Sequence, residues 1–264
     1  MAKRPDPVME DRRRQARAAQ QAALARAQRR RTLTQLAIVG GVAVVVIAII
    51  ATAVVLGTRG NDTPAAAGGG PVATGTTTVD GTSVPFAIGG AGDTATGVRV
   101  GAADAKVTMD LWVDYSCPHC QEFEATNNAA ISSLVASGTL AAVYHNIQIV
   151  TDYGTEAGSA SACLAVHDPN AWPAFNAALY ANHGEDTDGW GASDLARFAA
   201  ANGGGNATQS CITDGTYRSW ITANTSASAK AGVEGTPTMF LDGQKTDTLS
   251  GQALVDRVNA LAGA

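Results

Sequence analysis

The sequence has few of the residues that build metal and haem sites. Its 264 residues include four cysteines and four histidines. A structural zinc site needs two close pairs of ligands, whereas only Cys117 and Cys120 are close together. The other two cysteines, Cys163 and Cys211, are 48 positions apart. A c-type haem site needs His directly after the second cysteine, where this chain has Gln121. We therefore expect no metal and no bound cofactor.

Basic residues are scarce beyond the N-terminal part of the chain. The first 31 residues hold ten Lys and Arg against three acidic residues, a net charge of +7. Because the whole chain carries −5, the remainder carries −12. An acidic main domain is a poor partner for nucleic acid. We expect no nucleic-acid partner and connect the basic segment with the apolar run that follows it.

Charged residues are absent from Leu36 to Leu56. This run of 21 residues is mostly Val, Ile, Ala and Gly, and as a helix it matches the hydrocarbon thickness of a bilayer. Three arginines at 29–31 precede it closely, whereas only Arg59 follows closely. The positive-inside rule then places the N-terminus in the cytoplasm. We predict a basic cytoplasmic segment over 1–32 and a single transmembrane anchor over 33–58.

A cleaved signal peptide is the alternative for this segment. Ala51-Thr52-Ala53 loosely resembles a cleavage motif, but the apolar region would be unusually long. No cysteine lies nearby, which excludes a lipid anchor at this boundary. Residues 59–75, rich in Gly, Ala, Thr and Pro, are predicted to be a flexible linker. The anchor places the rest of the chain outside the cell membrane, where an even number of cysteines favours pairing.

The main domain, 76–264, combines strands with a run of helices. A strand over 106–113, a helix from Cys117 to about 136 and a strand over 139–149 form a βαβ unit, which predicts a parallel pair of strands. Shorter strands are expected at 76–79, 83–86, 98–100 and 238–241. Ala-rich helices are expected at about 156–166, 171–182, 193–202 and 214–231, followed by a C-terminal helix through Leu261. We predict an α/β domain with a helical insertion over about 155–232.

The Cys117-Pro118-His119-Cys120 motif lies at a predicted strand-to-helix turn. A sulfur at a helix N-terminus faces unpaired N–H groups and the positive end of the helix dipole, and both favour the thiolate. Cys117 is therefore the candidate nucleophile. Cys120, one turn later and more buried, would resolve the mixed disulfide. Pro118 suits the first helical turn, and His119 adds a neighbouring donor that can stabilise the thiolate.

A buried structural disulfide is the competing interpretation of the motif. It would not explain the placement at a strand-to-helix turn, so we favour redox chemistry. Stabilising the Cys117 thiolate stabilises the reduced form, which makes the disulfide a strong oxidant.

Over roughly residues 97–262 the chain resembles the DsbA-like branch of the thioredoxin superfamily. The resemblance rests on Asp114-Tyr115-Ser116, on the dicysteine motif and on the segment from Gly235 to Phe240. It implies a thioredoxin fold with a helical insertion. It also implies a cis peptide bond between Thr236 and Pro237, lying against the cysteines, with Thr236 offering backbone groups to a substrate strand.

The same resemblance implies an activity and its partners. We expect a thiol–disulfide oxidoreductase that donates the Cys117–Cys120 disulfide to exported proteins with free thiols. A membrane partner of the DsbB or vitamin-K-epoxide-reductase kind would reoxidise it. A reductase or isomerase, and a non-enzymatic binding or chaperone module, are the alternatives.

The chain departs from the family pattern at one position. Many relatives have a buried carboxylate six residues before the first cysteine, where this chain has Leu111. Asp110 is one place away and, by strand alternation, faces the opposite side of the sheet. We assign no catalytic role to Asp110 or to Asp114.

The remaining cysteines, Cys163 and Cys211, fall in or beside two helical segments of the insertion. A structural disulfide that staples the insertion is the preferred prediction. A second redox pair that relays electrons is the alternative.

Overall fold

The computed structural model describes residues 70, 72–89 and 97–263. These residues belong to a compact unit that spans Ala65–Ala264. The predicted basic segment over 1–32 and the predicted transmembrane anchor over 33–58 lie outside the described residues. Within the described ranges, no helix is long and apolar enough to cross a membrane.

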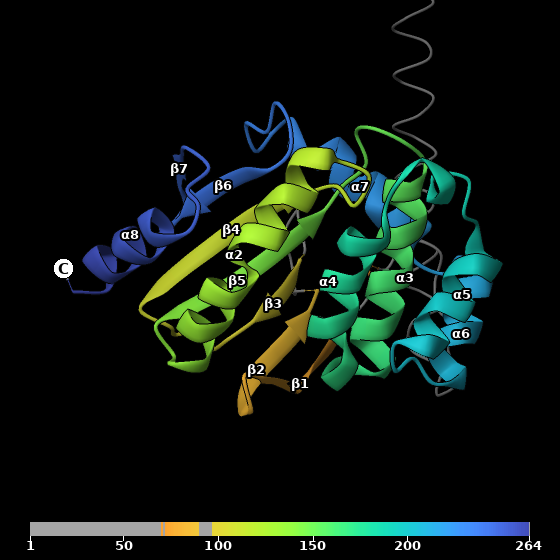
Figure 1. The fold of residues 1–264 in the computed structure, drawn as a ribbon, viewed down its shortest axis with the longest axis horizontal. Coiled ribbons are helices and arrows are strands. Elements are labelled where there is room, and N and C mark those ends of the chain that lie inside the picture. The colour runs from red at the N-terminus through yellow and green to blue at the C-terminus, as the bar shows by residue number, and fades with distance from the viewer. Residues whose placement is uncertain (1–69, 71, 90–96, 264) are drawn as a thin grey trace, which may run out of the picture. The chain divides into compact units, whose positions relative to one another are not determined.

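A seven-stranded mixed sheet forms the centre of this unit (Figure 1). Its strands are β1 (Ala73–Val79), β2 (Thr82–Ile88), β3 (Val98–Val100), β4 (Val107–Val113), β5 (Leu140–Asn146), β6 (Thr238–Leu241) and β7 (Gln244–Thr246). They lie in the order β1-β2-β3-β5-β4-β6-β7. Only β4 and β5 pair in parallel, and the other described pairs are antiparallel. The predicted parallel βαβ unit is confirmed.

Strand β4 packs against apolar residues on both faces of the sheet. Met109 and Leu111 point into the main core and are fully buried. Trp112 points to the other face, where it packs with Ile147 and Val233 in a second apolar cluster. The strand that leads to the dicysteine motif is therefore fixed from both sides.

Helix α2 (Pro118–Ala136) follows the motif and lies across β4 and β5 in Figure 1. Its buried stripe includes Phe123, Asn127 and Ile131. The Asn127 side-chain oxygen accepts a hydrogen bond of 2.7 Å from the N–H of Gly251. Gly251 is the N-cap of the C-terminal helix α8 (Gln252–Ala262), so this bond ties α8 to α2.

The helical insertion between β5 and β6 is present as predicted. It consists of α3 (Tyr153–His167), α4 (Trp172–Asn182), α5 (Ala192–Ala201), α6 (Asn206–Thr213) and α7 (Arg218–Ser228), with short 3-10 turns at Pro169–Ala171 and Glu185–Thr187. Helix α3 is rich in buried alanine and glycine, and these small side chains let neighbouring helices approach it closely.

Three predicted boundaries are wrong. The helix expected over 214–231 begins only at Arg218, because Gly215 adopts a positive φ of 62° and separates α6 from α7. The strand expected to reach 149 ends at Asn146. The N–H of Ile147 still donates to Val113 of β4, but those of residues 148–150 bind the side chains of Thr225 and Asp114 instead of a neighbouring strand. Strand β1 begins at Ala73, three residues inside the predicted linker.

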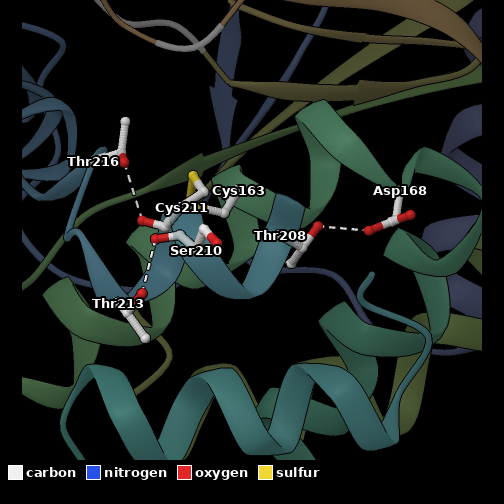
Figure 2. Close-up of a disulfide and its surroundings, with 7 residues drawn as sticks. All are labelled: Cys163, Asp168, Thr208, Ser210, Cys211, Thr213 and Thr216. Carbon is white, nitrogen blue, oxygen red and sulfur yellow. Dashed lines mark hydrogen bonds between the residues drawn. A yellow bond between two sulfur atoms is a disulfide. The ribbon is translucent and has the colours of Figure 1, made fainter. Parts of the chain in front are cut away.

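The predicted disulfide between Cys163 and Cys211 is present, with an S–S distance of 2.01 Å. It joins α3 to α6 (Figure 2). The exposed fractions of these cysteines are 0% and 7%. Beside it the Asp168 carboxylate accepts a 2.6 Å hydrogen bond from the Thr208 hydroxyl, which fixes the start of α6 as well.

Candidate active site

The dicysteine motif occupies the turn between β4 and the first turn of α2. Cys117 is the N-cap of α2, and Pro118 takes the first helical position, where a missing N–H has no cost. The N–H groups of Cys120 and Gln121 both donate to the Cys117 carbonyl, at 3.0 and 3.1 Å. The helix therefore starts at the first cysteine, as the sequence predicts. Both cysteines of the motif are free thiols here.

The Cys117 sulfur is stabilised as a thiolate. Its pKa is lowered from 9.0 to about 5, chiefly by a hydrogen bond from the Cys120 thiol. Burial opposes this shift, while the Thr236 side chain and the N–H groups of Cys120 and His119 lower the pKa further. These N–H groups belong to the first turn of α2, and that of Cys120 also donates to the Cys117 carbonyl at 3.0 Å. His119 thus supplies a donor, as predicted, but the donor is its backbone amide.

The Cys120 sulfur, in contrast, is stabilised as a thiol. Its pKa is raised, first because its thiol donates to Cys117 and second because it is buried. Only 1% of Cys120 is exposed, against 5% of Cys117. One sulfur is thus held as a thiolate and the other as a more deeply buried thiol, an arrangement that suits a nucleophile and a resolving cysteine.

Residues 236 and 237, more than a hundred positions away in the sequence, lie against the first cysteine. The Thr236–Pro237 peptide bond is cis, as the family resemblance implies. The carbonyl oxygen of Thr236 lies 3.3 Å from the Cys117 sulfur. The structure therefore brings together the two parts of the site that the sequence predicts.

A groove of about 380 Å³ opens beside the motif. Helix α2, the cis-proline segment and the loop before α8 contribute its lining residues: His119, Glu122, Phe123, Thr126, Thr236, Pro237, Thr248 and Ser250. Hydroxyl groups, one carboxylate and two apolar side chains thus share the groove.

Asp114, three residues before the first cysteine, is a completely buried anchor of the turn. One of its carboxylate oxygens accepts from the N–H and the hydroxyl of Ser116, at 2.8 and 2.6 Å. The other accepts from the N–H groups of Ile149 and Val150, at 2.7 and 2.9 Å. Asp114 therefore holds the loop after β5 against the turn that carries the cysteines. No role for this residue was predicted from the sequence.

Asp110 lies on the other face of β4 from Leu111, as strand alternation predicts. Its carboxylate is 2.8 Å from Nε2 of His145. The imidazole of His145 stacks on Trp112 with 4.6 Å between ring centroids. The sheet thus separates Asp110 from α2, and its contacts give it a structural role.

Glu124 is the residue that sequence analysis missed. It is buried at 5% exposure, one helical turn after Cys120, and it accepts a 3.1 Å hydrogen bond from Asn176. Burial raises its pKa from 4.5 to about 7. The sequence contains the signal, because Glu124 shares the helical stripe of Cys120, Asn127 and Ile131.

Three of the described histidines lie on separate elements and do not form a cluster. His145 belongs to β5, His167 ends α3 and His183 pairs with Asp188 at 2.9 Å. Across residues 72–89 and 97–263, no three His, Cys, Asp or Glu side chains are placed to hold a metal ion.

A family model described as thioredoxin matches residues 93–258 of the chain. Curated relatives include the serine/threonine-protein kinase PknE of Mycobacterium tuberculosis, 32% identical over 131 residues. That match covers 45% of this chain and 23% of the kinase. The chain thus spans about a quarter of the length of the curated relatives it matches.

Solved structures resemble the domain more completely. DsbA from Mycobacterium tuberculosis matches 64% of this chain and 93% of its own, at 24% identity and a TM-score of 0.55. MdbA from Corynebacterium diphtheriae, a thiol-disulfide oxidoreductase, matches 69% and 96%, at 23% identity and a TM-score of 0.56. BdbD from Bacillus subtilis matches 63% and 92%, at 18% identity and a TM-score of 0.57. These likenesses confirm the predicted DsbA-like fold.

Proposed function

Because the chain belongs to the thioredoxin family, we propose that it is a thiol–disulfide oxidoreductase with Cys117 as the nucleophile and Cys120 as the resolving cysteine. The observation that carries this proposal is the contrast between the two sulfurs. The pKa of Cys117 is lowered to about 5 at the start of α2, while that of Cys120 is raised. The solved structures of this fold include proteins described as thiol-disulfide oxidoreductases.

Transfer of the disulfide then proceeds in two exchange steps. A substrate thiolate attacks the Cys117 sulfur, the Cys117–Cys120 bond breaks, and Cys120 leaves with the electron pair and takes up a proton. A second substrate thiolate attacks the substrate sulfur of the mixed disulfide and releases Cys117 as a thiolate. The substrate loses two electrons and the dicysteine pair gains them. The low pKa of Cys117 makes it the better leaving group in the second step.

The direction of transfer follows from the same sulfur. A stabilised thiolate stabilises the reduced pair, so the disulfide form is a strong oxidant. We therefore favour donation of disulfides over the reductase and isomerase alternatives. The reduction potential of the pair tests this choice. We expect a value clearly more positive than the about −270 mV of thioredoxin, and a value near that figure contradicts an oxidase.

We further propose that the domain works outside the cytoplasmic membrane on exported proteins with free thiols. The predicted anchor over 33–58 and the disulfide between Cys163 and Cys211 both support this location, since structural disulfides persist in oxidising compartments. A membrane partner of the DsbB or vitamin-K-epoxide-reductase kind would reoxidise the pair.

An activity assay on the full-length chain separates the candidate functions. We expect the oxidised protein to oxidise a reduced, unfolded test protein faster than it reduces insulin disulfides as the reduced form. Cys117→Ala should abolish turnover. In Cys120→Ala the Cys117 thiolate should attack an insulin disulfide, release one insulin thiolate and stop at the mixed disulfide, which mass spectrometry detects. Activity in neither direction, with Cys117→Ala identical to the parent, would leave only the non-enzymatic binding module.

A further inference from the structure

The groove beside the dicysteine motif carries an uncompensated negative charge. Among its described lining residues, Glu122 is the one acidic side chain, and none is Lys or Arg. The Glu122 carboxylate is exposed, and it has no hydrogen-bond or ion-pair partner in the part of the chain that the structure describes. Helix α2 contains no Lys or Arg that could pair with it. A positively charged group in this groove would therefore find an unoccupied carboxylate.

Two hydroxyl groups of the groove add acceptor positions. The Thr126 hydroxyl donates to the carbonyl of Glu122 at 2.8 Å, and the Thr248 hydroxyl donates to the carbonyl of Pro237 at 3.3 Å. Because a hydroxyl has a single proton, each of these oxygens has only lone pairs left for a ligand. The groove thus favours a ligand that is rich in hydrogen-bond donors.

The side chain of arginine has the matching chemistry. Its guanidinium carries a positive charge and five N–H donors, and it binds carboxylates through paired hydrogen bonds. Its aliphatic stem packs on apolar surface while the charged end stays hydrated. Phe123 and Pro237 provide apolar surface in the groove. Arginine is therefore the side chain that this lining fits best.

Glu122 lies within reach of a residue close to the cysteine of a bound substrate. The groove includes Thr236, whose carbonyl oxygen is 3.3 Å from the Cys117 sulfur. Glu122 follows Cys117 by five residues along α2, which is about 8 Å at the helical rise. An extended polypeptide covers about 7 Å in two residues. An arginine two positions from the reacting cysteine can thus place its guanidinium at Glu122.

We propose that the groove selects polypeptides with an arginine near the reacting cysteine, and that Glu122 binds the guanidinium. This inference rests on the proposed oxidoreductase function and names the class of thiol that the site favours. The bonds broken and formed are those of the two exchange steps above, so Glu122 affects substrate binding and leaves the redox chemistry to the cysteines. The net charge of −12 beyond residue 31 attracts every basic polypeptide, whereas Glu122 discriminates by position.

Single-turnover oxidation of two matched peptides by the full-length protein tests this selectivity. Each peptide contains two cysteines that can form a disulfide. One peptide has arginine two positions before and after each cysteine, and the other has uncharged citrulline there. The oxidised protein is mixed with excess reduced peptide, and mass spectrometry follows the formation of reduced protein. If neither peptide reduces the disulfide of the parent, the proposed function fails, and this inference with it.

The measured quantity is the ratio of the rate constants for the arginine and citrulline peptides. Arginine also alters the reactivity of a neighbouring thiol, but that effect is the same for every protein variant and cancels when the ratios are compared. We expect the ratio in the parent to be about three times that in Glu122→Gln, as for a partly exposed ion pair. Glu122→Lys should lower the ratio further through repulsion, and Glu122→Asp should retain part of the preference.

Asp104→Asn is the matched control. Asp104 is also exposed and acidic, but it precedes β4, whereas the motif follows this strand. This variant should keep the ratio of the parent. Equal ratios in the parent and in Glu122→Gln would overturn the proposal while leaving the oxidoreductase function intact. An equal fall in Asp104→Asn would also overturn it, because the preference would then come from the net charge of the domain.

A spectroscopic measurement locates the arginine directly and leaves Glu122 in place. In Cys120→Ala, the Cys117 thiolate attacks a peptide whose single cysteine carries a thiopyridyl group, releases thiopyridone and retains the peptide as a mixed disulfide. The ¹³C carboxyl resonance of Glu122 should shift with the arginine peptide and stay in place with the citrulline peptide. The same resonance position in the two mixed disulfides would overturn the proposal.

Discussion

At the scale of single residues, Asp114 controls the turn that carries both cysteines. Its two oxygens accept four hydrogen bonds from the turn and from the loop after β5. This network leaves no room for a larger neighbour at Gly154, the second residue of α3. A Cβ atom there would lie 2.2 Å from a carboxylate oxygen of Asp114.

We therefore expect Gly154→Ala to destabilise the protein by about 2 kcal/mol, as overpacking of a fixed site does. Gly158→Ala, in the same helix, is the matched control. Its Cβ would approach no polar group: it would lie 2.8 Å from the terminal carbon of Ile221, which can shift, and 3.6 Å from Cβ of Asn146. Alanine also favours a helix by roughly 1 kcal/mol over glycine. Urea unfolding measures both changes. Equal losses for the two variants would show that Asp114 does not impose the constraint.

The Cys117 thiolate predicts a pH dependence of stability in the reduced protein. Because folding lowers this pKa from 9.0 to about 5, the stabilisation is complete above pH 9 and is lost as pH falls towards 5. At pH 7 it should amount to about 2 kcal/mol, allowing for solvent screening. Urea unfolding of the reduced parent and of reduced Cys117→Ala should differ by this amount at pH 7 and converge near pH 5. A constant difference would contradict the lowered pKa.

Residue roles could be predicted where they depend on local spacing, and Thr236 and Pro237 could be placed at the site through the family resemblance. The start of α2 at Cys117 follows from the motif and the helical stripe after it. The contacts of Asp114 could not be predicted, because Ile149 and Val150 come from 35 and 36 positions away and only folding brings them near. The burial of Glu124 was not predicted, because a charged residue on a helix is usually exposed to solvent.

At the scale of secondary-structure elements, the insertion depends on one covalent link. The disulfide joins α3 to α6, and α6 has only eight residues. So short a helix has little stability alone, which is also why the sequence pattern did not reveal it. The three-residue strand β7 escaped prediction for the same reason.

We expect the double variant Cys163→Ala/Cys211→Ala to lose about 4 kcal/mol of unfolding free energy, the value for closing a loop of this length. Denaturant unfolding measures the loss, and titration of Cys117 near pH 5 should be unchanged. In the parent, the lowered pKa of Cys117 stabilises the reduced form of the active-site pair, so reductants should open the Cys117–Cys120 pair before the Cys163–Cys211 disulfide. Reduction of the two pairs at the same reductant concentration would favour the alternative of a second redox pair.

At the scale of the whole molecule, charge and hydropathy distinguish three successive segments of the sequence. A basic segment and an uncharged run of 21 residues precede an acidic domain with a disulfide. The fold class, the parallel pair and the insertion were predictable because each has a long periodic or compositional signal. The arrangement of the antiparallel edge strands was not, since short strands carry little pattern.

The proposed location can be tested on intact cells. We expect the full-length protein to stay in the membrane fraction after an alkaline carbonate wash. A membrane-impermeant maleimide should label Cys117 from outside when the pair is reduced, and Cys117→Ala should remove the label. Labelling only after lysis would place the domain on the cytoplasmic side.

Strand β4, with β5 on one side and β6 on the other, also determines how the site behaves in time. Backbone amides in the interior of a sheet exchange with deuterium far more slowly than those at its edges. β1 and β7, at the two ends of the sheet, can therefore open and close many times while β4 stays paired. The reactive cysteines follow the end of that strand, so the catalytic turn should stay assembled through these brief openings.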